Sequence, residues 1–147
     1  MEENQEWISP VSFYFQVQFH GEPKISGVRF QEVSGLNLER NVSILNKSGE
    51  PDSIGELTHG NIVLKRALEP LDERLSEWIR ECMAPSGKIE SRNLVIFLMD
   101  NNRQSLACWF CGNAYPVEWE VSSFNAMKSQ QAIETLEMAF ELLDRKK

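Results

Sequence analysis

The fold class of this chain follows from residues 12–19, which read SFYFQVQF. Every second residue of this stretch is apolar, namely Phe13, Phe15, Val17 and Phe19. Because the side chains of a strand point alternately to its two faces, this alternation predicts a half-buried β-strand. The turn-forming residues 20–23, His-Gly-Glu-Pro, end it.

Further strands are expected along the rest of the chain. They cover residues 27–33, a segment from Leu36 with Leu38, Val42 and Ile44 as apolar markers, and residues 61–67, 93–99 and 106–112. Residues 100–103, Asp-Asn-Asn-Arg, have turn chemistry and predict a hairpin between the last two strands. Pro116 breaks the run because proline donates no hydrogen bond to a ladder, and residues 117–121 then alternate as another strand.

One amphipathic helix interrupts the strands. Its apolar stripe consists of Leu71, Leu75, Trp78, Ile79 and Cys82. Pro70 suits a first helical turn, Asp72 and Glu73 complement the helix dipole, and residues 85–87, Pro-Ser-Gly, end the helix. We therefore expect a mainly β fold, an antiparallel barrel or sandwich with one flanking helix.

Residues 130–143 fit two structures. Ile133, Leu136, Phe140 and Leu143 make a helical stripe, and the Ala, Glu, Leu and Met content favours a helix. The same segment also alternates, with Leu136, Met138, Phe140 and Leu142 on one face. The residues alone leave helix and strand open.

Composition excludes some classes of function. The length of 147 residues fits one domain over residues 1–147, and the net charge of −7 argues against a sequence-independent nucleic-acid binder. Three cysteines suit a reducing compartment better than a disulfide framework. The polar, acidic N-terminus lacks the features of a signal peptide, and no apolar run could span a bilayer. We expect synthesis in the cytoplasm without a membrane anchor.

The motifs that carry chemistry are weak. Cys108 and Cys111 have redox or zinc spacing, but on a strand they point to opposite faces, and no second Cys or His pair completes a zinc site. His20 and His59 are interpreted as turn residues. The pairs Glu118/Glu120 and Glu134/Glu137 are interpreted as a solvated face. We therefore expect no enzymatic activity, no cofactor and no metal.

The four tryptophans divide into two groups. Trp78 and Trp109 lie in apolar patterns and are expected in the core. Trp7 and Trp119 lie beside acidic residues, where an amphipathic ring marks either an interface or a partly wetted core position.

The order of several motifs resembles the tube proteins of T4-like contractile phages and of extracellular contractile injection systems. The motifs are residues 13–17, residues 30–36 (FQEVSGL), residues 61–66 (NIVLKR), the helix with Trp78, residues 109–117, and residues 132–139. Within them, the residues that carry the resemblance most are Phe30, Glu32, Val33, Ser34, Gly35, Leu36, Trp78, Asn113, Ala114, Tyr115 and Pro116. Ser34-Gly35 permits a sharp turn or a positive φ, and Tyr115-Pro116 permits a ladder to end.

The resemblance implies a non-enzymatic subunit of an inner tube. Six copies would form a ring in which adjacent sheets join around a lumen, and the rings would stack. Its partners would be a sheath protein, a baseplate hub, a tube terminator, and lumen cargo or a tape-measure protein. Such a protein is made in the bacterial cytoplasm and assembled into a phage tail or injection particle. The joined barrel favours strand over helix for residues 132–142.

Three features depart from the family pattern, one of which is that the middle loop lacks the usual glycine-rich sequence. Thr58-His59-Gly60 stands where relatives usually have Pro-Gly, and Lys65-Arg66-Ala67 where they commonly have Lys-Arg-Gly. A specialised first ring beside the baseplate is therefore an alternative to the repeated tube subunit. In a different class, a monomeric ligand-binding β-barrel is a further alternative, and an enzyme of unrecognised type is the third.

Residues 46–58 are interpreted as a long loop that docks on the adjacent ring. The segment is polar and contains Gly49, Pro51 and Gly55. Long loops without secondary structure are usually functional or disordered. Its expected contact residues are Lys47, Glu50, Asp52, Ile54, Glu56 and Leu57, with Ile54 and Leu57 as apolar anchors. The net charge also suggests an acidic or neutral lumen, to which Glu118, Glu120 and Glu134 would contribute.

Overall fold

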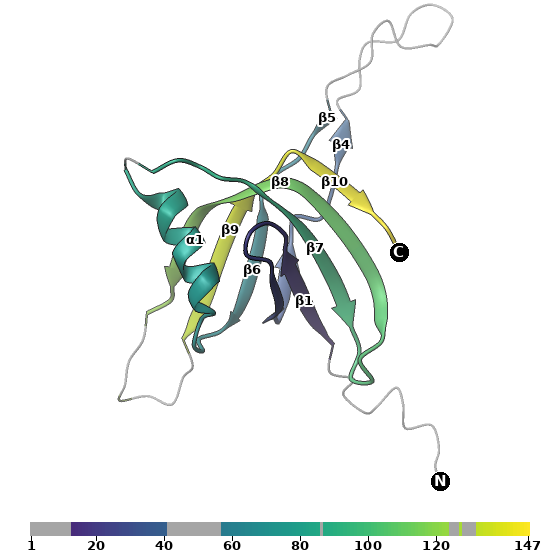
Figure 1. Ribbon diagram of the computed structural model, residues 1–147. Coiled ribbons are helices and arrows are strands. Elements are labelled where there is room, and N and C mark those ends of the chain that lie inside the picture. The colour runs from purple at the N-terminus through teal and green to yellow at the C-terminus, as the bar shows by residue number, and fades with distance from the viewer. Residues whose placement is uncertain (1–12, 41–56, 86, 124–126, 128–131) are drawn as a thin grey trace, which may run out of the picture.

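The computed structural model describes residues 13–40, 57–85, 87–123, 127 and 132–147 (Figure 1). Its elements are β1 (Tyr14–Phe19), β2 (Ile25–Phe30), β3 (Glu32–Ser34), β4 (Glu39–Arg40), β5 (Leu57–Thr58), β6 (Ile62–Ala67), α1 (Glu73–Met83), β7 (Arg92–Met99), β8 (Ser105–Val121), β9 (Ile133–Ala139) and β10 (Leu142–Arg145). All strand pairs among the described residues are antiparallel. The mainly β prediction with one helix is confirmed.

The opening strand confirms its predicted alternation. Val17 and Phe19 are fully buried, whereas Gln16 and Gln18 are directed to the other face of β1. β1 pairs with β2 on one side and with β7 on the other, with Val17 opposite both Val28 and Ile96. Three apolar strands therefore share one inward face.

The sheet closes on itself because of a single residue. The strand order is β2-β1-β7-β8-β9-β6-β3, so β2 and β3 lie at opposite ends of the path. Only Gln31 separates them in sequence, and its backbone N–H donates to the carbonyl of Lys65 on β6 at 2.8 Å. The predicted strand 27–33 is thus two strands, and the change of partner at Gln31 brings the two ends of the sheet together as a barrel.

β8 is one long, bent strand, where the sequence predicted two. Its first part pairs with β7 and β10, and its second part, residues 115–121, pairs with β9. Pro116 is buried within the strand and does not end it; the register shifts between Pro116 and Glu118 instead. The bend begins at Asn113, whose φ is 55°. A bulge accommodates the proline, so the strand passes from one part of the barrel to the other.

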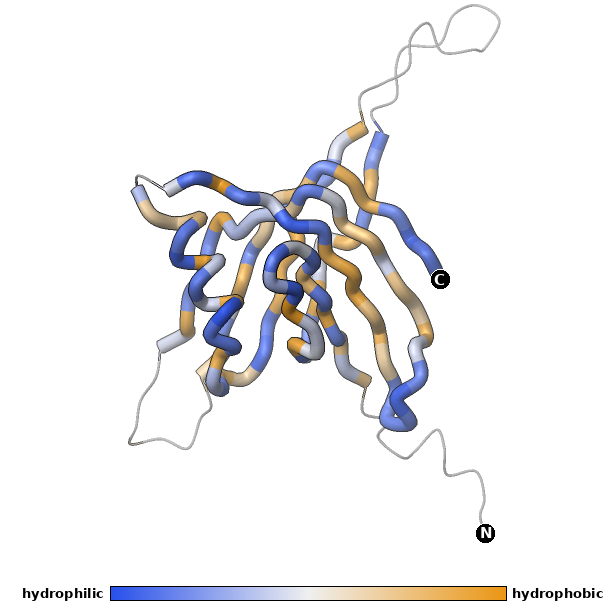
Figure 2. The backbone as a smooth tube through the Cα atoms, viewed as in Figure 1, coloured by the Kyte–Doolittle hydropathy of each residue, from blue (hydrophilic) through white to orange (hydrophobic). Residues whose placement is uncertain are grey.

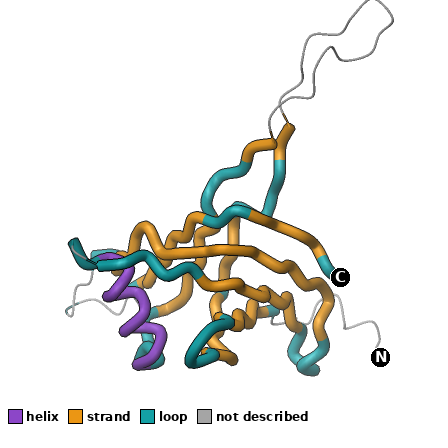
Figure 3. Tube along the Cα trace, turned by 45° about the horizontal axis from the view of Figure 1, so that its top comes forward, coloured by secondary structure: helices purple, strands orange, loops and turns teal. Residues whose placement is uncertain are grey.

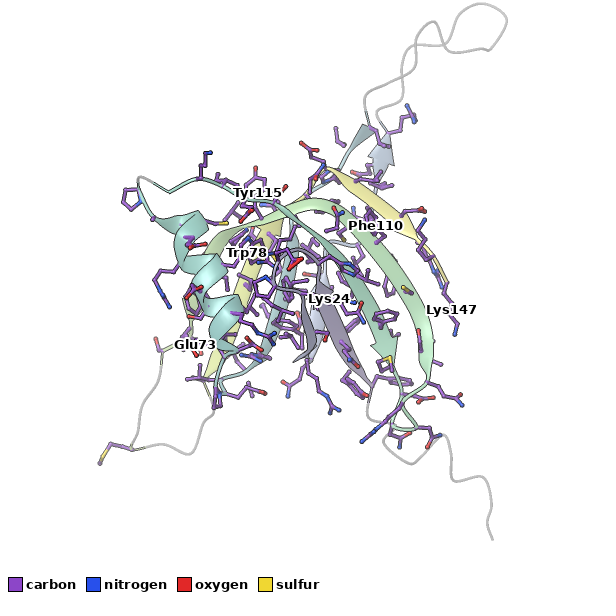
Figure 4. All side chains as sticks on the ribbon, in the orientation of Figure 1. Lys24, Glu73, Trp78, Phe110, Tyr115 and Lys147 are labelled. Carbon is purple, nitrogen blue, oxygen red and sulfur yellow. The ribbon has the colours of Figure 1, made fainter. Side chains whose placement is uncertain are left out.

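Helix α1 begins later than predicted. Asp72 is its N-cap, and the side chain accepts a hydrogen bond from the backbone N–H of Arg74 at 2.8 Å. Pro70 therefore precedes the helix and does not occupy its first turn. Leu75, Trp78, Ile79 and Cys82 are buried, as the stripe predicted. Figure 4 shows Trp78 directed from α1 toward the strands.

The closing segment is strand, not helix. β9 pairs with both β6 and β8, and this pairing determines its conformation despite the local helix propensity. Met138 and Leu136 are buried opposite Ile62 and Leu64 of β6. β10, which follows after a short break and pairs with β8, was not predicted as a separate strand.

A small hairpin stands apart from the barrel (Figures 1 and 3). Within the described residues β4 and β5 pair only with each other, with Arg40 opposite Leu57. The strand predicted from Leu36 is therefore only two residues long within the described part, and Leu57-Thr58 is strand where a loop was predicted. Val42 and Ile44 lie outside the described residues.

The core fills the barrel between the strands and α1. Its fully buried large side chains include Phe19, Ile62, Leu94, Ile96 and Met138. Figure 2 shows the hydrophobic colouring along β1, β7 and β8. Trp78 is buried in this cluster, as predicted for a core residue. Trp109, also predicted to lie in the core, is partly buried and packs against the cluster.

Candidate assembly edges and the polar face

Two strand edges lie at the ends of a four-stranded part of the sheet. This part runs β3-β6-β9-β8, with residues 115–121 as the contribution of β8. Among the described residues, β3 pairs only with β6, and residues 115–121 pair only with β9. We call these two the β3 edge and the β8 edge. Open strand edges present unpaired backbone groups that template pairing with another chain.

The hydrogen-bond pattern shows which groups point out of the β8 edge. The N–H of Ser122 donates to the carbonyl of Ile133 on β9 at 2.8 Å. In an antiparallel ladder such pairs alternate with non-hydrogen-bonded pairs. Trp119 and Val121, which lie opposite Leu136 and Glu134, are of the second kind. Their backbone N–H and C=O groups therefore point away from β9, toward the open edge.

The outward face of these four strands is polar. We call it the polar face, and it is formed by Glu32, Lys65, Thr135, Glu137, Glu118 and Glu120. A hollow of about 400 Å³ on it is lined by Glu32, Lys65, Glu120 and Thr135 with neighbours Gln31, Arg66, Ser122 and Ile133. Lys65 is the single cation among the six residues that define the face, so carboxylates dominate its charge.

Glu134 corrects one expectation from the sequence. It was grouped with Glu137 as part of a solvated face and as a lumen residue, but its exposed fraction is 5%. Its carboxylate accepts from Arg66 Nε at 3.0 Å and from the Trp119 indole Nε1 at 2.8 Å. A buried charge needs this kind of pairing, because desolvation alone would disfavour it. Glu118 and Glu120 are exposed, as expected.

The 30–36 motif has a structural explanation. Phe30 ends β2 and is buried, while Glu32, Val33 and Ser34 form β3. Gly35 has φ of +91°, and a Cβ there would lie 2.1 Å from the carbonyl oxygen of Asn61. Only glycine combines this φ with such a close approach. Leu36 then packs against the core. The motif forms the β3 edge and fixes its position against β6.

The 113–116 motif lies at the bend of β8. The Asn113 backbone N–H donates to Asn93 Oδ1 at 3.0 Å, and its side-chain Nδ2 donates to Glu141 Oε1 at 2.7 Å. Asn tolerates the left-handed region better than most residues. Ala114 is fully buried, and Tyr115 and Pro116 begin the pairing with β9. The motif directs the chain toward the β8 edge.

The proposed assembly loop is only partly described. Lys47, Glu50, Asp52, Ile54 and Glu56 lie outside the described residues. Leu57 is on β5 and is 50% exposed, away from the core. The described part of the hairpin therefore carries one of the two expected apolar anchors outward from the barrel.

The three cysteines are free and buried. Burial raises the pKa of Cys111 to about 12, and it raises the pKa of Cys82 and Cys108 as well. At neutral pH these thiols are protonated, so they are poor nucleophiles. Among the described residues, no group of three or more His, Cys, Asp or Glu side chains gathers as a metal site.

His59 stacks on Phe140 with ring centroids 4.0 Å apart.

Sequence reasoning missed two buried arginines. Arg66 bonds Glu134, and Arg92 donates to the carbonyl of Pro23 at 2.7 Å while its guanidinium lies 5.4 Å from the Trp78 ring centroid. A signal existed for Arg66, because it continues the inward alternation of Ile62 and Leu64. For Arg92 the signal is absent, since its partners are backbone carbonyls of a distant turn.

The fold is similar to that of chains from contractile injection systems and to that of an Hcp protein. A chain of the anti-feeding prophage (AFP) baseplate, solved by cryo-electron microscopy, is similar, with a TM-score of 0.70, 23% identity, and coverage of 99% of this chain and 97% of that chain. A chain from the PVC sheath-tube complex of an extracellular contractile injection system is similar with a TM-score of 0.69 and 22% identity, and the match covers 99% of each chain. Hcp1 from Flavobacterium johnsoniae is similar with a TM-score of 0.58 and 15% identity, and the match covers 90% of this chain and 94% of Hcp1.

The family follows from the sequence itself. The model of the T4-like virus tail tube protein gp19 family matches residues 11–144, and the chain belongs to that family. It is a structural tube subunit of a phage tail or contractile injection system. This family membership favours the tube subunit over the alternative of a monomeric ligand-binding barrel. Among curated proteins, no sequence matches this chain. In the part of the chain that the structure describes, no helix is long and apolar enough to cross a membrane.

Proposed function

We propose that six copies, each one domain over residues 1–147, close into a ring by pairing the β3 edge of one copy with the β8 edge of the next. The observation that carries the proposal is that both ends of one four-stranded sheet are open among the described residues. Pairing them satisfies the outward groups of Trp119 and Val121 and leaves neither of these two edges open. The number six is supported by the similar AFP baseplate chain, whose structure is 6-fold symmetrised.

The polar face then surrounds the lumen. It lies on the side of the four strands that is turned away from the hydrophobic core. Glu32, Glu118 and Glu120 give it an acidic character, which would let negatively charged cargo or a tape-measure protein pass without adhering. In assembled tubes of the Glu118→Cys variant, the new thiol should react with small thiol reagents and be shielded from reagents too large for the channel. Equal reaction with both would oppose this orientation.

Stacking is assigned to the β4–β5 hairpin and the residues 46–56 that it carries. The hairpin projects from the barrel (Figure 3). Leu57 on β5 is half exposed. The similar structures include a sheath-tube complex, a tube terminator and a baseplate. By analogy, the partners of this chain are a sheath protein around the tube, a baseplate hub and a tube terminator at its ends. We infer that the chain is made in the bacterial cytoplasm and acts as a structural component, not as a catalyst.

The family-motif residues serve this assembly in two places. Glu32, Val33 and Ser34 are the β3 edge, which Gly35 holds against β6. Asn113 to Pro116 direct β8 toward its edge. Trp78 contributes to assembly indirectly, because it anchors α1 to the barrel.

A proline in the β8 edge tests the ring. Val121→Pro removes the outward N–H and leaves the Glu120 and Ser122 bonds to β9 in place. The matched control Val121→Thr keeps the N–H. We expect Val121→Pro to be a folded monomer by circular dichroism and size-exclusion chromatography, whereas Val121→Thr forms rings. Normal rings of Val121→Pro would exclude pairing through this edge.

A first ring beside the baseplate is the second candidate role. The similar AFP baseplate chain and the departures at Thr58-His59-Gly60 and Lys65-Arg66-Ala67 favour it. The two roles differ in the extent of polymerisation. A repeated tube subunit alone forms long tubes at high concentration, whereas a first-ring protein stops at single or paired rings.

A further inference from the structure

A groove crosses the outward face of β1, β2 and β7, on the opposite side of these strands from the core. Two adjoining hollows of about 300 and 230 Å³ form it and share Arg103. We call this groove the basic groove. Its floor contains both polar and apolar side chains. Its lining residues are Tyr14, Gln16, Gln18, Arg29, Phe97, Met99, Asn101, Arg103 and Ser105.

The groove holds two cations, Arg29 and Arg103, that have no carboxylate partner within the described part of the chain. The Arg29 guanidinium lies 4.3 Å from the centroid of the Tyr14 ring, and Arg103 is on the β7–β8 turn. Among the described residues, neither guanidinium forms an ion pair. In a chain of net charge −7, this is a local excess of positive charge beside half-buried Phe97 and Met99. Such a surface suits an acidic, amphipathic partner.

Helix α1 presents a surface of the complementary kind. Glu73, Glu77 and Glu81 follow one another at four-residue spacing on its exposed side, and we call them the acidic ridge. None of the three side chains forms an ion pair with a described residue. Both arginines of the helix are engaged elsewhere: Arg74 bonds Asp72, and Arg80 donates to Ser76 Oγ at 3.1 Å.

Ring closure brings these two surfaces together. α1 packs beside β8, so it accompanies the β8 edge. The β3 edge is joined through Gln31 to β2, which contributes Arg29 to the basic groove. Figure 1 shows α1 and the β7–β8 turn on opposite flanks of the molecule. Pairing the β8 edge of one copy with the β3 edge of the next therefore places α1 next to the β1–β2 side of its neighbour.

We infer that the acidic ridge of α1 docks in the basic groove of the adjacent copy in the ring. This inference rests on the proposed ring and adds a specific contact to it: Glu77 and Glu81 against Arg29 and Arg103, over the apolar floor of Phe97 and Met99. The contact is head-to-tail, since each copy gives its helix to one neighbour and its groove to the other. It sets the order of copies and selects against wrong pairings by charge.

Two complementary charge reversals test the inference. The groove variant carries Arg29→Glu and Arg103→Glu, and the ridge variant carries Glu77→Lys and Glu81→Lys. Each variant alone places like charges across every contact, so each should remain monomeric in native mass spectrometry. In an equimolar mixture, every contact of an alternating ring joins opposite charges. The mixture should therefore form rings that contain equal numbers of the two variants.

Controls separate this contact from the ring itself. Glu137→Lys, on the polar face of the central strand β9, should leave rings intact. Circular dichroism checks that each variant is folded, and Arg29→Gln with Arg103→Gln replaces a groove variant that is not. With the Gln pair, weaker rings support the contact and unchanged rings overturn it. If wild-type rings form and both reversal variants also form rings alone, the inference is wrong while the proposed ring stands. If each variant is monomeric and their mixture also stays monomeric, the inferred contact between the acidic ridge and the basic groove is wrong. If the wild-type protein itself is a monomer, the proposed ring is wrong.

Discussion

Arg66 and Glu134 face each other on neighbouring strands inside the barrel, with Arg66 Nε 3.0 Å from Glu134 Oε1. Both side chains are buried, and the same carboxylate accepts from the Trp119 indole of the β8 edge. This pair links three of the four strands that end in the two open edges. Its integrity therefore bears on both the fold of one copy and the presentation of the β8 edge.

Removal of one charge from this pair should destabilise the protein strongly. Glu134→Leu removes the buried counter-charge of Arg66 and leaves it only the exposed Glu69, 3.6 Å from its Nη1, and breaking such a buried pair costs about 3–5 kcal/mol. Urea unfolding in the monomeric Val121→Pro background measures the cost without a contribution from assembly. The double variant Arg66→Leu, Glu134→Leu should recover much of the loss, because a hydrophobic pair of similar volume is often neutral. A fully stable Glu134→Leu would contradict the buried pairing.

Trp78 should be the main anchor of α1. Its exposed fraction is 2%, its ring meets Phe19 edge-on at 5.8 Å, and its indole N–H donates to the Glu90 carbonyl at 2.7 Å. Trp78→Ala is therefore expected to cost about 3–5 kcal/mol in the free energy of unfolding. Met83→Ala on the same helix, at a position that is 44% exposed, is the matched control and should change little. Equal effects of the two would show that Trp78 does not anchor α1.

Gly35 should resist substitution while Gly60 accepts it. At Gly35 the positive φ of +91° and the Asn61 carbonyl, 2.1 Å from an added Cβ, both oppose a side chain. At Gly60 an added Cβ meets nothing within 4 Å. Thermal unfolding of Gly35→Ala and Gly60→Ala compares them. The expected result is a marked loss of Tm for Gly35→Ala alone, and rings should be lost with it because the β3 edge moves. Equal Tm values would refute the close approach.

The N-cap of α1 should make stability depend on acidic pH. Hydrogen bonds from Arg74 lower the pKa of Asp72 below its usual 3.8. Since the folded-state pKa is the lower one, the contribution is complete above the usual value and is lost as pH falls through the folded value. Asp72→Ala should cost about 1 kcal/mol at pH 7. The difference from wild type, measured by urea unfolding, should shrink below the usual pKa; a constant difference would contradict the role of the charge.

Shortening residues 47–56 to a tight turn should separate ring formation from stacking. The β4–β5 hairpin pairs only with itself among the described residues, so its loss should spare the barrel. We expect normal folding and normal rings, with no long tubes by electron microscopy. Leu57→Ser, which removes the exposed anchor of the hairpin, should weaken stacking in the same direction. Tubes of normal length from the shortened chain would show that the segment does not join rings.

Local patterns predicted the elements whose structure depends on near neighbours. The alternation of residues 13–19, the stripe of α1 and the hairpin turn at residues 100–103 all follow from periodicity or turn chemistry. Residues 133–139 did not follow from local preference, because two flanking strands determine their conformation. Their strand assignment came from the family resemblance.

The errors have a common physical origin in distant partners. Pro116 stays within β8 because a bulge against β9 accommodates it. Glu134 is buried because Arg66 lies opposite on β6, a neighbour that the sequence alone does not specify. Gln31 divides a predicted strand because its two sides pair with strands at opposite ends of the sheet path. None of these could be read from one segment.

Cryo-electron microscopy of the purified full-length chain tests the central claim most directly. The account predicts closed six-fold rings with a continuous β-wall around a channel, in which residues 115–121 of one copy pair with β3 of the next. A monodisperse monomer at high concentration would contradict it. So would rings in which these two edges lie apart.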